Sequence, residues 1–369
     1  MRKTYKFKAK LSKTTAANAT QWLGLCQQLY NLALEQRIVA YKRCGVSLST
    51  YSQSNELPEF KKAFPEFQKV GSQTLQETIE RLGKAFQGFF SRIRKGEKAG
   101  FPRFRSFHRY DSFTLKNTGW KLDGRYLKIK NVGIFKLFLS QPIEGIIKTV
   151  TVKRDACGDW FVSFSCDNVP KKEYKRPEKD VVGIDVGIRH FCTDTDGLHV
   201  ENPKYYHKAQ AALRRKQRQV SRRKKGSVRR KKAVKELARV HRKIARMRLD
   251  FLHKTANHYI EKYQNICVED LKIRNMVRNS KLSKSISDSG WNTFFSLLSY
   301  KAEEAGRKLI KVDPKNTSQN CSGCGVKVPK ALAVKVHKCP HCNLSLDRDI
   351  NAAYNIAAAG SGQLLQAIT

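Results

Sequence analysis

The sequence lacks the features that would carry a chain into or across a membrane. It has no apolar run of about 18 residues, the length that a transmembrane helix needs, and it has no lipidation motif or amphipathic membrane helix. Its first ten residues are basic but contain no apolar core of a signal peptide. We therefore expect the protein to stay in the cytosol.

Acidic residues are scarce. The 369 residues include 31 Asp and Glu against 73 Lys and Arg, which gives a formal net charge of +42. A compact chain with this charge repels itself, whereas binding to a polyanion releases condensed counterions and is favourable. Basic proteins that coat membranes or pack in ribosomes have a similar composition, but the absence of membrane features favours a nucleic-acid partner.

The ten cysteines fall into two groups. Six occur singly, mostly among apolar neighbours, as buried thiols do: Cys26, Cys44, Cys157, Cys166, Cys192 and Cys267. The other four, Cys321, Cys324, Cys339 and Cys342, form the pattern C-x₂-C-x₁₄-C-x₂-C. Two such pairs supply the four thiolates of a closed tetrahedral zinc site, so we expect one structural Zn²⁺ without catalytic activity. His341, inside the second pair, is expected not to be a ligand.

The N-terminal half combines helices and strands. Apolar residues at helical spacing predict two amphipathic helices that each bury one face, one through Trp22, Cys26, Leu29 and Ala33, the other through Leu75, Ile79, Leu82, Phe86 and Phe89. Later the period changes to two, and Val150 and Val152 face Trp160, Val162 and Phe164 across a loop at 155–159, which predicts a β-hairpin within a small barrel or sheet.

Between these parts, the segment 100–107 alternates arginines with aromatic residues. Arg103 and Arg105 are suited to contact a nucleic-acid backbone while the aromatic rings stack on bases. An equally simple interpretation is a basic loop whose aromatic residues are buried.

Three acids in the C-terminal half stand at the ends or starts of apolar elements. Asp185 lies within a short β-branched strand, Glu269 ends another strand, and Asp349 begins an Ala-rich helix that Asp347 is placed to cap. Each position alone suits a turn, a strand end or a cap. Together they are hard oxygen ligands suited to two Mg²⁺ or Mn²⁺ ions at a phosphodiester.

A strongly basic segment follows the first acid. Residues 208–248 contain 19 Lys and Arg and one acid, Glu236. An apolar stripe of Leu237, Val240, Ile244, Met247 and Phe251, with a break at 226–227, predicts a helical hairpin on a nucleic-acid backbone rather than a disordered arm. The arginines expected to bind phosphates are Arg214, Arg215, Arg218, Arg222, Arg223, Arg229, Arg230, Arg239 and Arg242.

These motifs resemble those of the TnpB nucleases of IS200/IS605- or IS607-type transposons, which are related to Cas12 effectors. The matching segments are 100–104, 183–187, 250–254, 268–271, 317–321 and 347–353, so the resemblance covers nearly the whole chain. It assigns the three acids of a RuvC-type (RNase H-like) centre to Asp185, Glu269 and, by the Asp-x-Asn-Ala-Ala pattern, Asp349 rather than Asp347.

The resemblance implies an α+β multidomain fold. A wedge-type β-barrel would comprise 1–14 and 115–179, a helical recognition region 15–114, and the nuclease domain 180–314 and 344–369. A basic helical insertion at 205–262 and a zinc ribbon at 315–343 would interrupt the nuclease domain. The seam between the two halves is expected in the polar stretch 171–178, with the boundary near residue 179.

The resemblance also implies an RNA-guided DNA endonuclease of the prokaryotic cytosol, associated with the nucleoid. Its partners would be a guide RNA from the transposon end, the target double-stranded DNA and its displaced strand, and cleavage would occur beside a short transposon-adjacent motif. Three alternatives remain: a miniature CRISPR effector, a guide-dependent DNA-binding repressor, which would lack one of the acids, and a transposase, which the zinc ribbon before the third acid disfavours.

Overall fold

The computed structural model describes residues 1–170, 172–331 and 334–366. They form two compact units, Met1–Pro170 and Lys171–Thr369, and the second unit begins at the first residue of the polar stretch, eight residues before position 179. Lys171 of that stretch, Leu332 and Ala333 of the expected zinc ribbon, and the last three residues of the expected nuclease domain lie outside the described residues.

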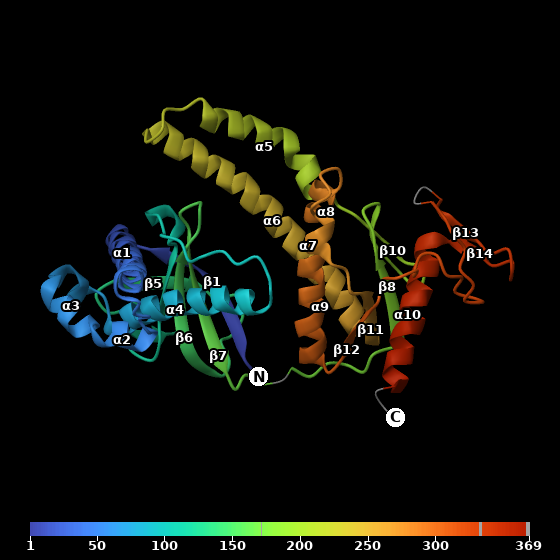
Figure 1. The fold of residues 1–369 in the computed structure, drawn as a ribbon, viewed down its shortest axis with the longest axis horizontal. Coiled ribbons are helices and arrows are strands. Elements are labelled where there is room, and N and C mark those ends of the chain that lie inside the picture. The colour runs from blue at the N-terminus through green and yellow to red at the C-terminus, as the bar shows by residue number, and fades with distance from the viewer. Residues whose placement is uncertain (171, 332–333, 367–369) are drawn as a thin grey trace. The chain divides into compact units, whose positions relative to one another are not determined.

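The first unit is a seven-stranded sheet with the order β2-β6-β7-β1-β5-β4-β3, packed against helices (Figure 1). In the described part of the chain no pairing joins β2 to β3, so the sheet is open. The strands are β1 (Lys3–Leu11), β2 (Ser112–Leu115), β3 (Trp120–Asp123), β4 (Tyr126–Ile129), β5 (Gly133–Phe138), β6 (Ile146–Arg154) and β7 (Trp160–Asp167). The helices are α1 (Lys13–Cys44), α2 (Thr50–Asn55), α3 (Leu57–Ala63) and α4 (Ser72–Arg94), with short 3₁₀ turns η1 (Pro65–Lys69) and η2 (Phe107–Arg109).

The predicted hairpin and helices of this unit are present. In β6 and β7, Val150 pairs with Phe164 and Val152 with Val162, and the loop between the strands spans 155–159. The stripe from Trp22 to Ala33 is buried in α1. In α4 the stripe is buried as far as Leu82, whereas Phe86 and Phe89 are only half-buried.

The second unit is built on a five-stranded sheet with the order β10-β9-β8-β11-β12. Strand β11 pairs in parallel with β8 and β12, and β9 pairs antiparallel with β8 and β10. The strands are β8 (Lys179–Val186), β9 (His190–Asp194), β10 (His199–Glu201), β11 (Tyr263–Glu269) and β12 (Lys308–Val312), and a separate pair is β13 (Val336–Lys338) and β14 (Ser345–Asp347). The helices are α5 (Tyr205–Ser221), α6 (Val228–Lys262), α7 (Ile273–Met276), α8 (Ser283–Ser289), α9 (Trp291–Ala305) and α10 (Arg348–Gln366).

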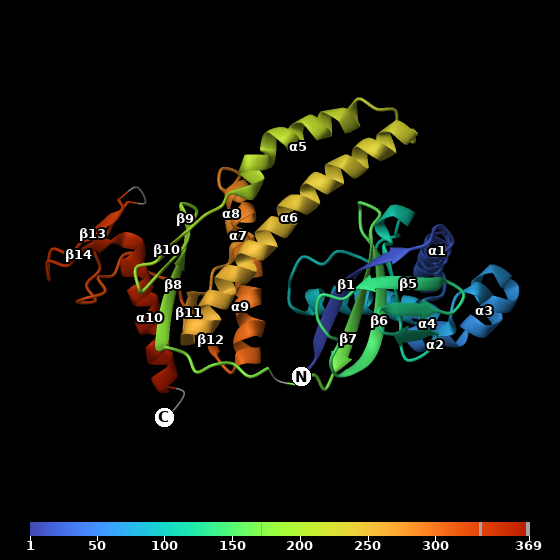
Figure 2. The same ribbon diagram turned by 180° about the vertical axis from the view of Figure 1, so that it is seen from behind.

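Helices cover both faces of this sheet, with α10 on one side and α9 with the end of α6 on the other (Figures 1 and 2). Val182 and Ile184 of β8 belong to the core that α6 and α9 complete, whereas Val181 packs with Ile356 of α10. The strand alternates between the two faces because successive side chains point to opposite sides.

The structure agrees with the mixed α+β fold expected from the sequence. Within the described residues, none of the helices is both long and apolar enough to span a bilayer.

Candidate functional site

Strand alternation places two of the three expected acids beneath α10. Asp185 follows Ile184 in β8, and Glu269 follows Val268 in β11, where Ile184 and Val268 are register partners in adjacent parallel strands. Since Ile184 and Val268 point towards α6 and α9, the two acids point to the opposite face. They therefore meet at the same strand ends, on the side that α10 covers.

Two glycines allow α10 to lie directly on this face. A Cβ at Gly183 of β8 would collide with the backbone oxygen of Ala353, and a Cβ at Gly360 of α10 would collide with the Sγ of Cys267 in β11. The helix and the strands thus approach as closely as the backbone permits. This contact holds the first turn of α10, and Asp349 with it, over the ends of β8 and β11.

The charges of two of the acids act on the third, Asp185. Burial raises the pKa of Asp185 well above its ordinary value, and the charges of Glu269 and Asp349 raise it further. Glu269 is 8% exposed, and burial raises its pKa as well. A site that raises carboxyl pKa values in this way favours a bound cation.

In this structure Arg348 partly supplies that cation. Its Nη2 and Nε donate to Oδ1 of Asp349 at 2.8 and 3.1 Å, and Arg348 Nη1 donates to the backbone oxygen of Val334 at 3.2 Å. Among the described residues, the oxygen atoms of the three carboxylates do not cluster as closely as the Sγ atoms of the four ribbon cysteines, which lie within 4.8 Å of one another.

Asp347 has the capping position expected from the sequence. Its Oδ1 accepts hydrogen bonds from the backbone N–H groups of Asp349 at 2.7 Å and Ile350 at 3.3 Å. It thereby satisfies donors that the first turn of a helix leaves unpaired. The two neighbouring acids thus differ in their contacts: Asp347 binds backbone, whereas Asp349 acts on Asp185.

Sequence reasoning missed three polar residues that support the acids. Thr317 Oγ1 donates to Oε1 of Glu269 at 2.5 Å. Asn355 Nδ2 donates to the backbone oxygen of Thr317 at 2.8 Å, and the fully buried Asn351 accepts from the backbone N–H of Ser322 at 2.9 Å. Thr317 and Asn351 stood in the TnpB-like segments, but nothing in the sequence indicated their partners 48 and 29 residues away.

The four ribbon cysteines are gathered as predicted. Cys321 and Cys342 have their Sγ atoms 3.5 Å apart, and Cys324 and Cys339 have theirs 3.6 Å apart. A tetrahedral zinc with Zn–S distances of about 2.3 Å implies an S–S separation of roughly 3.8 Å, which these values approach. Backbone N–H groups of Cys342 and His341 lower the pKa of Cys339 to about 6, so its thiolate forms readily. This cluster can hold a metal ion.

Both cysteine pairs end in the same local geometry. Gly325, after the first pair, and Asn343, after the second, have positive φ angles of 76° and 58°. Their backbone N–H groups donate to the carbonyl oxygens of Cys321 and Cys339. His341 is exposed and is not among the clustered ligands, as expected.

The basic segment forms two long helices, α5 and α6, which pack against each other around Leu213, Val220 and Ile244 (Figure 1). The break lies where it was predicted: Gly226 has a φ of 83°, and the Ser227 side chain caps α6 by accepting from the N–H of Arg230. Six of the nine predicted arginines are exposed, and none of the described ion pairs involves them: Arg214, Arg215, Arg218, Arg222, Arg223 and Arg229.

Three of the nine arginines and one stripe residue depart from this pattern. Arg230 and Arg242 are half-buried, and Arg239 pairs with Glu236. The prediction that Met247 belongs to the apolar stripe is wrong, since it is 41% exposed. Among the single cysteines, Cys44 at the end of α1 is exposed rather than buried.

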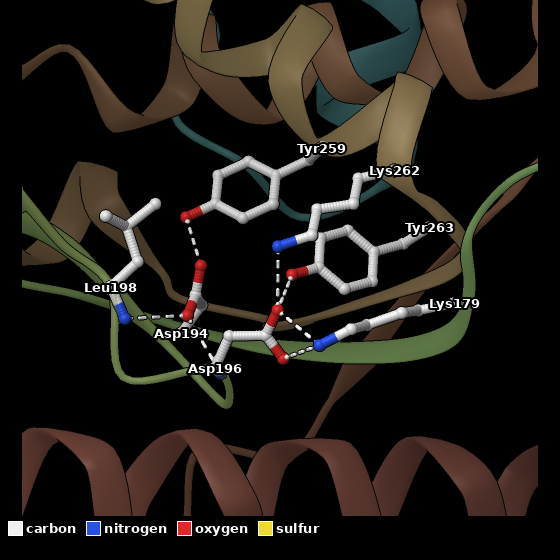
Figure 3. Close-up of polar contacts among 7 residues, drawn as sticks. All are labelled: Lys179, Asp194, Asp196, Leu198, Tyr259, Lys262 and Tyr263. Atoms are coloured by element: carbon white, nitrogen blue, oxygen red, sulfur yellow. Dashed lines mark hydrogen bonds and ion pairs between the residues drawn. The ribbon is translucent and has the colours of Figure 1, made fainter.

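Two acids hold the base of the helical hairpin, one in α8 and one in the turn after β9. Asp288 of α8 accepts from Arg248 of α6 at 2.6 Å and from the backbone N–H of Tyr206 in the first turn of α5 at 3.0 Å. At the end of α6, Asp196 accepts from Lys262 at 2.9 Å and Tyr263 at 2.6 Å, and also from Lys179 of β8 (Figure 3).

This second anchor is strongly ionic. Although burial opposes ionisation, the hydrogen bonds from Lys179, Lys262 and Tyr263 hold the pKa of Asp196 well below its ordinary value. The neighbouring Asp194 is completely buried and accepts from the Tyr259 hydroxyl at 3.2 Å (Figure 3). The basic hairpin therefore starts and ends on the sheet that carries Asp185.

Comparison with known proteins identifies the family. Residues 163–280 match the OrfB_IS605 family model, described as "Probable transposase", and residues 291–356 match the "Cas12f1-like, TNB domain" model. A Streptomyces pristinaespiralis protein described as a "Putative RNA-guided DNA endonuclease" is 34% identical over 98% of this chain and 90% of its own length. The chain belongs to the TnpB family.

A second relative and a solved structure agree with this membership. InsQ of Escherichia coli K12, which has the same description, is 29% identical over 98% of this TnpB-family chain and 92% of its own length. A cryo-EM structure of a Cas12f1-sgRNA-target DNA complex is similar with a TM-score of 0.62 at 16% identity, covering 97% of this chain and 98% of that one. At this identity the structural likeness shows the fold alone.

The loop at 100–107 of this TnpB-family chain leaves its rings accessible. Phe101 and Phe104 are 48% and 56% exposed, so the interpretation that these aromatic residues are buried is wrong. Amide side chains of α1 hold the loop: Asn31 exchanges two hydrogen bonds with the backbone of Arg105, at 2.8 and 3.0 Å. Arg103 and Arg105 are exposed beside these rings.

The raised pKa of Asp185 predicts a stability effect in the TnpB-family chain. The unfolded carboxyl ionises near pH 3.8, so the folded state loses stability as the pH rises from that value through the higher folded pKa. Asp185→Asn removes this penalty and should raise the melting temperature of metal-free protein at pH 7, by about 2–4 °C for each kcal/mol relieved.

Calorimetry at pH 4 and pH 7 without Mg²⁺ or Mn²⁺ measures this effect. Asp180→Asn, an exposed acid on the same strand, is the matched control and should leave the melting temperature nearly unchanged. An Asp185→Asn protein that melts no higher than its parent at pH 7 would contradict the raised pKa of Asp185.

Proposed function

We propose that the chain is an RNA-guided DNA endonuclease that cleaves target DNA with Asp185, Glu269 and Asp349. The observation that carries the proposal is the convergence of these acids beneath α10, in a chain whose full-length relatives are described as RNA-guided DNA endonucleases. The strand order β10-β9-β8-β11-β12, in which β9 alone runs antiparallel to the other strands, is that of an RNase H-like sheet, which supports a RuvC-type centre.

The residues of the centre are suited to divalent cations. Three carboxylates are hard ligands, and the charges of two of them raise the pKa of the third, Asp185, while the charge of Arg348 opposes that shift. When bound, two Mg²⁺ or Mn²⁺ ions would activate water and stabilise the leaving 3′ oxygen of the phosphodiester. Thr317 fixes the orientation of Glu269, and α10 holds Asp349 in place, so that the chain presents its ligands without rearranging its strands. We assign the ribbon cysteines to one structural zinc ion.

The remaining regions would bind the guide RNA and the target DNA. The hairpin at 205–262 would hold phosphates, setting affinity without reading sequence. A guide RNA from the transposon end would read the target by base pairing, and the protein would read a short adjacent motif. We assign 1–14 and 115–179 to the wedge domain, 15–114 to the recognition region and 315–343 to the ribbon, and place the enzyme on the nucleoid of a prokaryotic cytosol.

The alternatives differ in what they would do with the acids. A guide-dependent repressor would have no use for three facing carboxylates, so their presence favours cleavage. The words "Probable transposase" belong to a family model covering 163–280, whereas relatives matched over almost the whole chain are described as endonucleases. A miniature CRISPR effector would share the chemistry and differ in the source of its guide.

Exchange of the guide tests this function directly. RNA that co-purifies with the protein is sequenced and remade with a new 5′- or 3′-terminal targeting segment, and the protein is reconstituted with it. We expect Mg²⁺-dependent cleavage of a plasmid that matches the new segment and of no plasmid that matches the old one. Cleavage that ignores the RNA sequence would contradict the proposal.

The basic hairpin yields a separate prediction. Replacing Arg222, Arg223, Arg229 and Arg230 with Gln should weaken nucleic-acid binding equally for all sequences. It should also flatten the plot of log affinity against log salt by roughly 0.7 to 0.9 units for each lost phosphate contact. Fluorescence anisotropy titrations at salt concentrations between about 50 and 300 mM measure this slope.

A control variant has the same loss of charge in the first unit. It replaces four exposed lysines: Lys62, Lys69, Lys84 and Lys121. If this variant flattens the salt dependence as much as the hairpin variant does, net charge rather than contacts at the hairpin sets the affinity.

A further inference from the structure

The first unit contains an aromatic hollow that the proposed nuclease does not use. It has a volume of about 440 Å³ and lies where the end of α1, the end of α4 and the loop after α4 meet. Its main lining residues are Arg37, Tyr41, Phe86, Phe89, Phe90 and Phe101. This volume is within the range of about 300–1,000 Å³ typical of small-ligand sites.

Several rings that line this aromatic hollow are partly exposed. Phe101 packs edge-on against Phe86 and Phe89, with ring centroids 5.5 and 5.4 Å apart. Tyr41 and Phe90 are 67% and 52% exposed. Exposed rings on both walls of a hollow gain free energy when a flat apolar surface covers them.

The wall contains a half-buried cation, Arg37, for which the described residues provide no anionic partner. Arg37 donates from Nε to Oε1 of Gln53 at 2.7 Å and from Nη2 to Oγ1 of Thr50 at 3.3 Å, and its guanidinium lies over the ring of Phe86. Its described hydrogen bonds thus go to neutral oxygens. A desolvated charge of this kind is stabilised by an anion, and guanidinium groups bind phosphate well.

The charges around the hollow select the kind of ligand. Lys42 is a second cation of the lining, and among the described lining residues none is acidic. A second copy of this chain would bring another +42 charge to a basic rim and would be repelled. A nucleotide matches both features, because its base is a flat ring and its phosphate is an anion.

We propose that the aromatic hollow binds an unpaired nucleotide of the nucleic acid held by this chain, with the base between the exposed rings and a phosphate at Arg37. This inference rests on the proposed function for its partner. It adds a site for single-stranded nucleic acid in the first unit, separate from the hairpin and the nuclease centre. RNA and DNA share the required chemistry, so either strand can supply the nucleotide.

Photo-crosslinking tests the site at residue level. Full-length protein with Asp185→Ala, which keeps DNA intact, is irradiated with oligo(dT) or oligo(rU) of 20 nucleotides, and the adducts are mapped by mass spectrometry. We expect adducts on peptides containing Tyr41, Phe90 or Phe101. Tyr41→Ala/Phe90→Ala should remove these adducts and weaken binding about tenfold, on the order of one stacked base.

The matched control is Phe138→Ala in β5, because Phe138 is 53% exposed, like Phe90, but does not line the hollow. It should keep both the adducts and the affinity. Adducts confined to 205–262 would overturn the hollow while leaving the nuclease intact, and no adducts anywhere would instead count against the proposed function. Sedimentation that shows a monomer–dimer change in the Tyr41→Ala/Phe90→Ala protein, with its adducts unchanged, would identify the hollow as a protein interface and overturn the proposal. The oligo(dT) and oligo(rU) arms identify the strand.

Discussion

Replacing Asp185, Glu269 or Asp349 with Ala, each alone, should abolish DNA cleavage while guide-RNA and target binding remain nearly unchanged. In the proposed function the carboxylates would hold the ions that stabilise the transition state, whereas the basic helices would supply the affinity. The three positions belong to one centre because the charges of Glu269 and Asp349 raise the pKa of Asp185. Cleavage of a guide-matched plasmid in Mg²⁺, measured beside filter binding, separates the two effects.

Asp347→Ala is the internal control for this experiment. Asp347 accepts hydrogen bonds from the first backbone N–H groups of α10, so its loss should cost about 1 kcal/mol of stability and preserve substantial cleavage. An active Asp349→Ala protein beside an inactive Asp347→Ala protein would reverse the assignment of the third ligand. Cleavage by all four variants would reject the nuclease centre altogether.

Removal of zinc should unfold the C-terminal region rather than merely slow cleavage. Four thiolates whose Sγ atoms lie within 4.8 Å of one another repel without a cation, and the strand pair next to them, β13 and β14, is short. Cys339→Ser should therefore lower the zinc content and the melting temperature together. Metal analysis and calorimetry of the purified protein measure both.

The control for this prediction lies within the second cysteine pair. His341 is exposed and outside the ligand set, so His341→Ala should keep the parent's zinc content and melting temperature. A Cys339→Ser protein with normal zinc and normal stability would refute the ribbon assignment. Loss of zinc should also disturb the position of Glu269, because Thr317, four residues before Cys321, donates a hydrogen bond to it.

The parts of the site that depend on residues close together in the chain could be predicted from the sequence. Strand alternation around Asp185 and Glu269, the cap at Asp347 and the cysteine spacing each depend on residues within a few positions of one another. The turn at 226–227 was also predictable, since a glycine and a serine that caps the next helix mark it. These signals are local, so the sequence contains them in full.

The missed features depend on contacts between distant segments. Nothing near Gly183 in the sequence shows that α10 lies on it, and nothing near Asp288 shows that it binds Arg248, 40 residues earlier. Met247 follows the helical period but is 41% exposed. Periodicity gives the face that a helix could bury, and tertiary packing decides how much of it is buried.

The close packing of α10 on β8 also bears on how the enzyme is made. Asp349 and the helix that covers β8 and β11 come after the basic hairpin, the first two acids and all four cysteines in the order of synthesis. A nascent chain that has reached the ribbon already contains α5 and α6 but only two of the three acids. In the proposed function, translation would thus separate binding from cutting in time, and RNA could associate with the growing protein before any DNA could be cleaved.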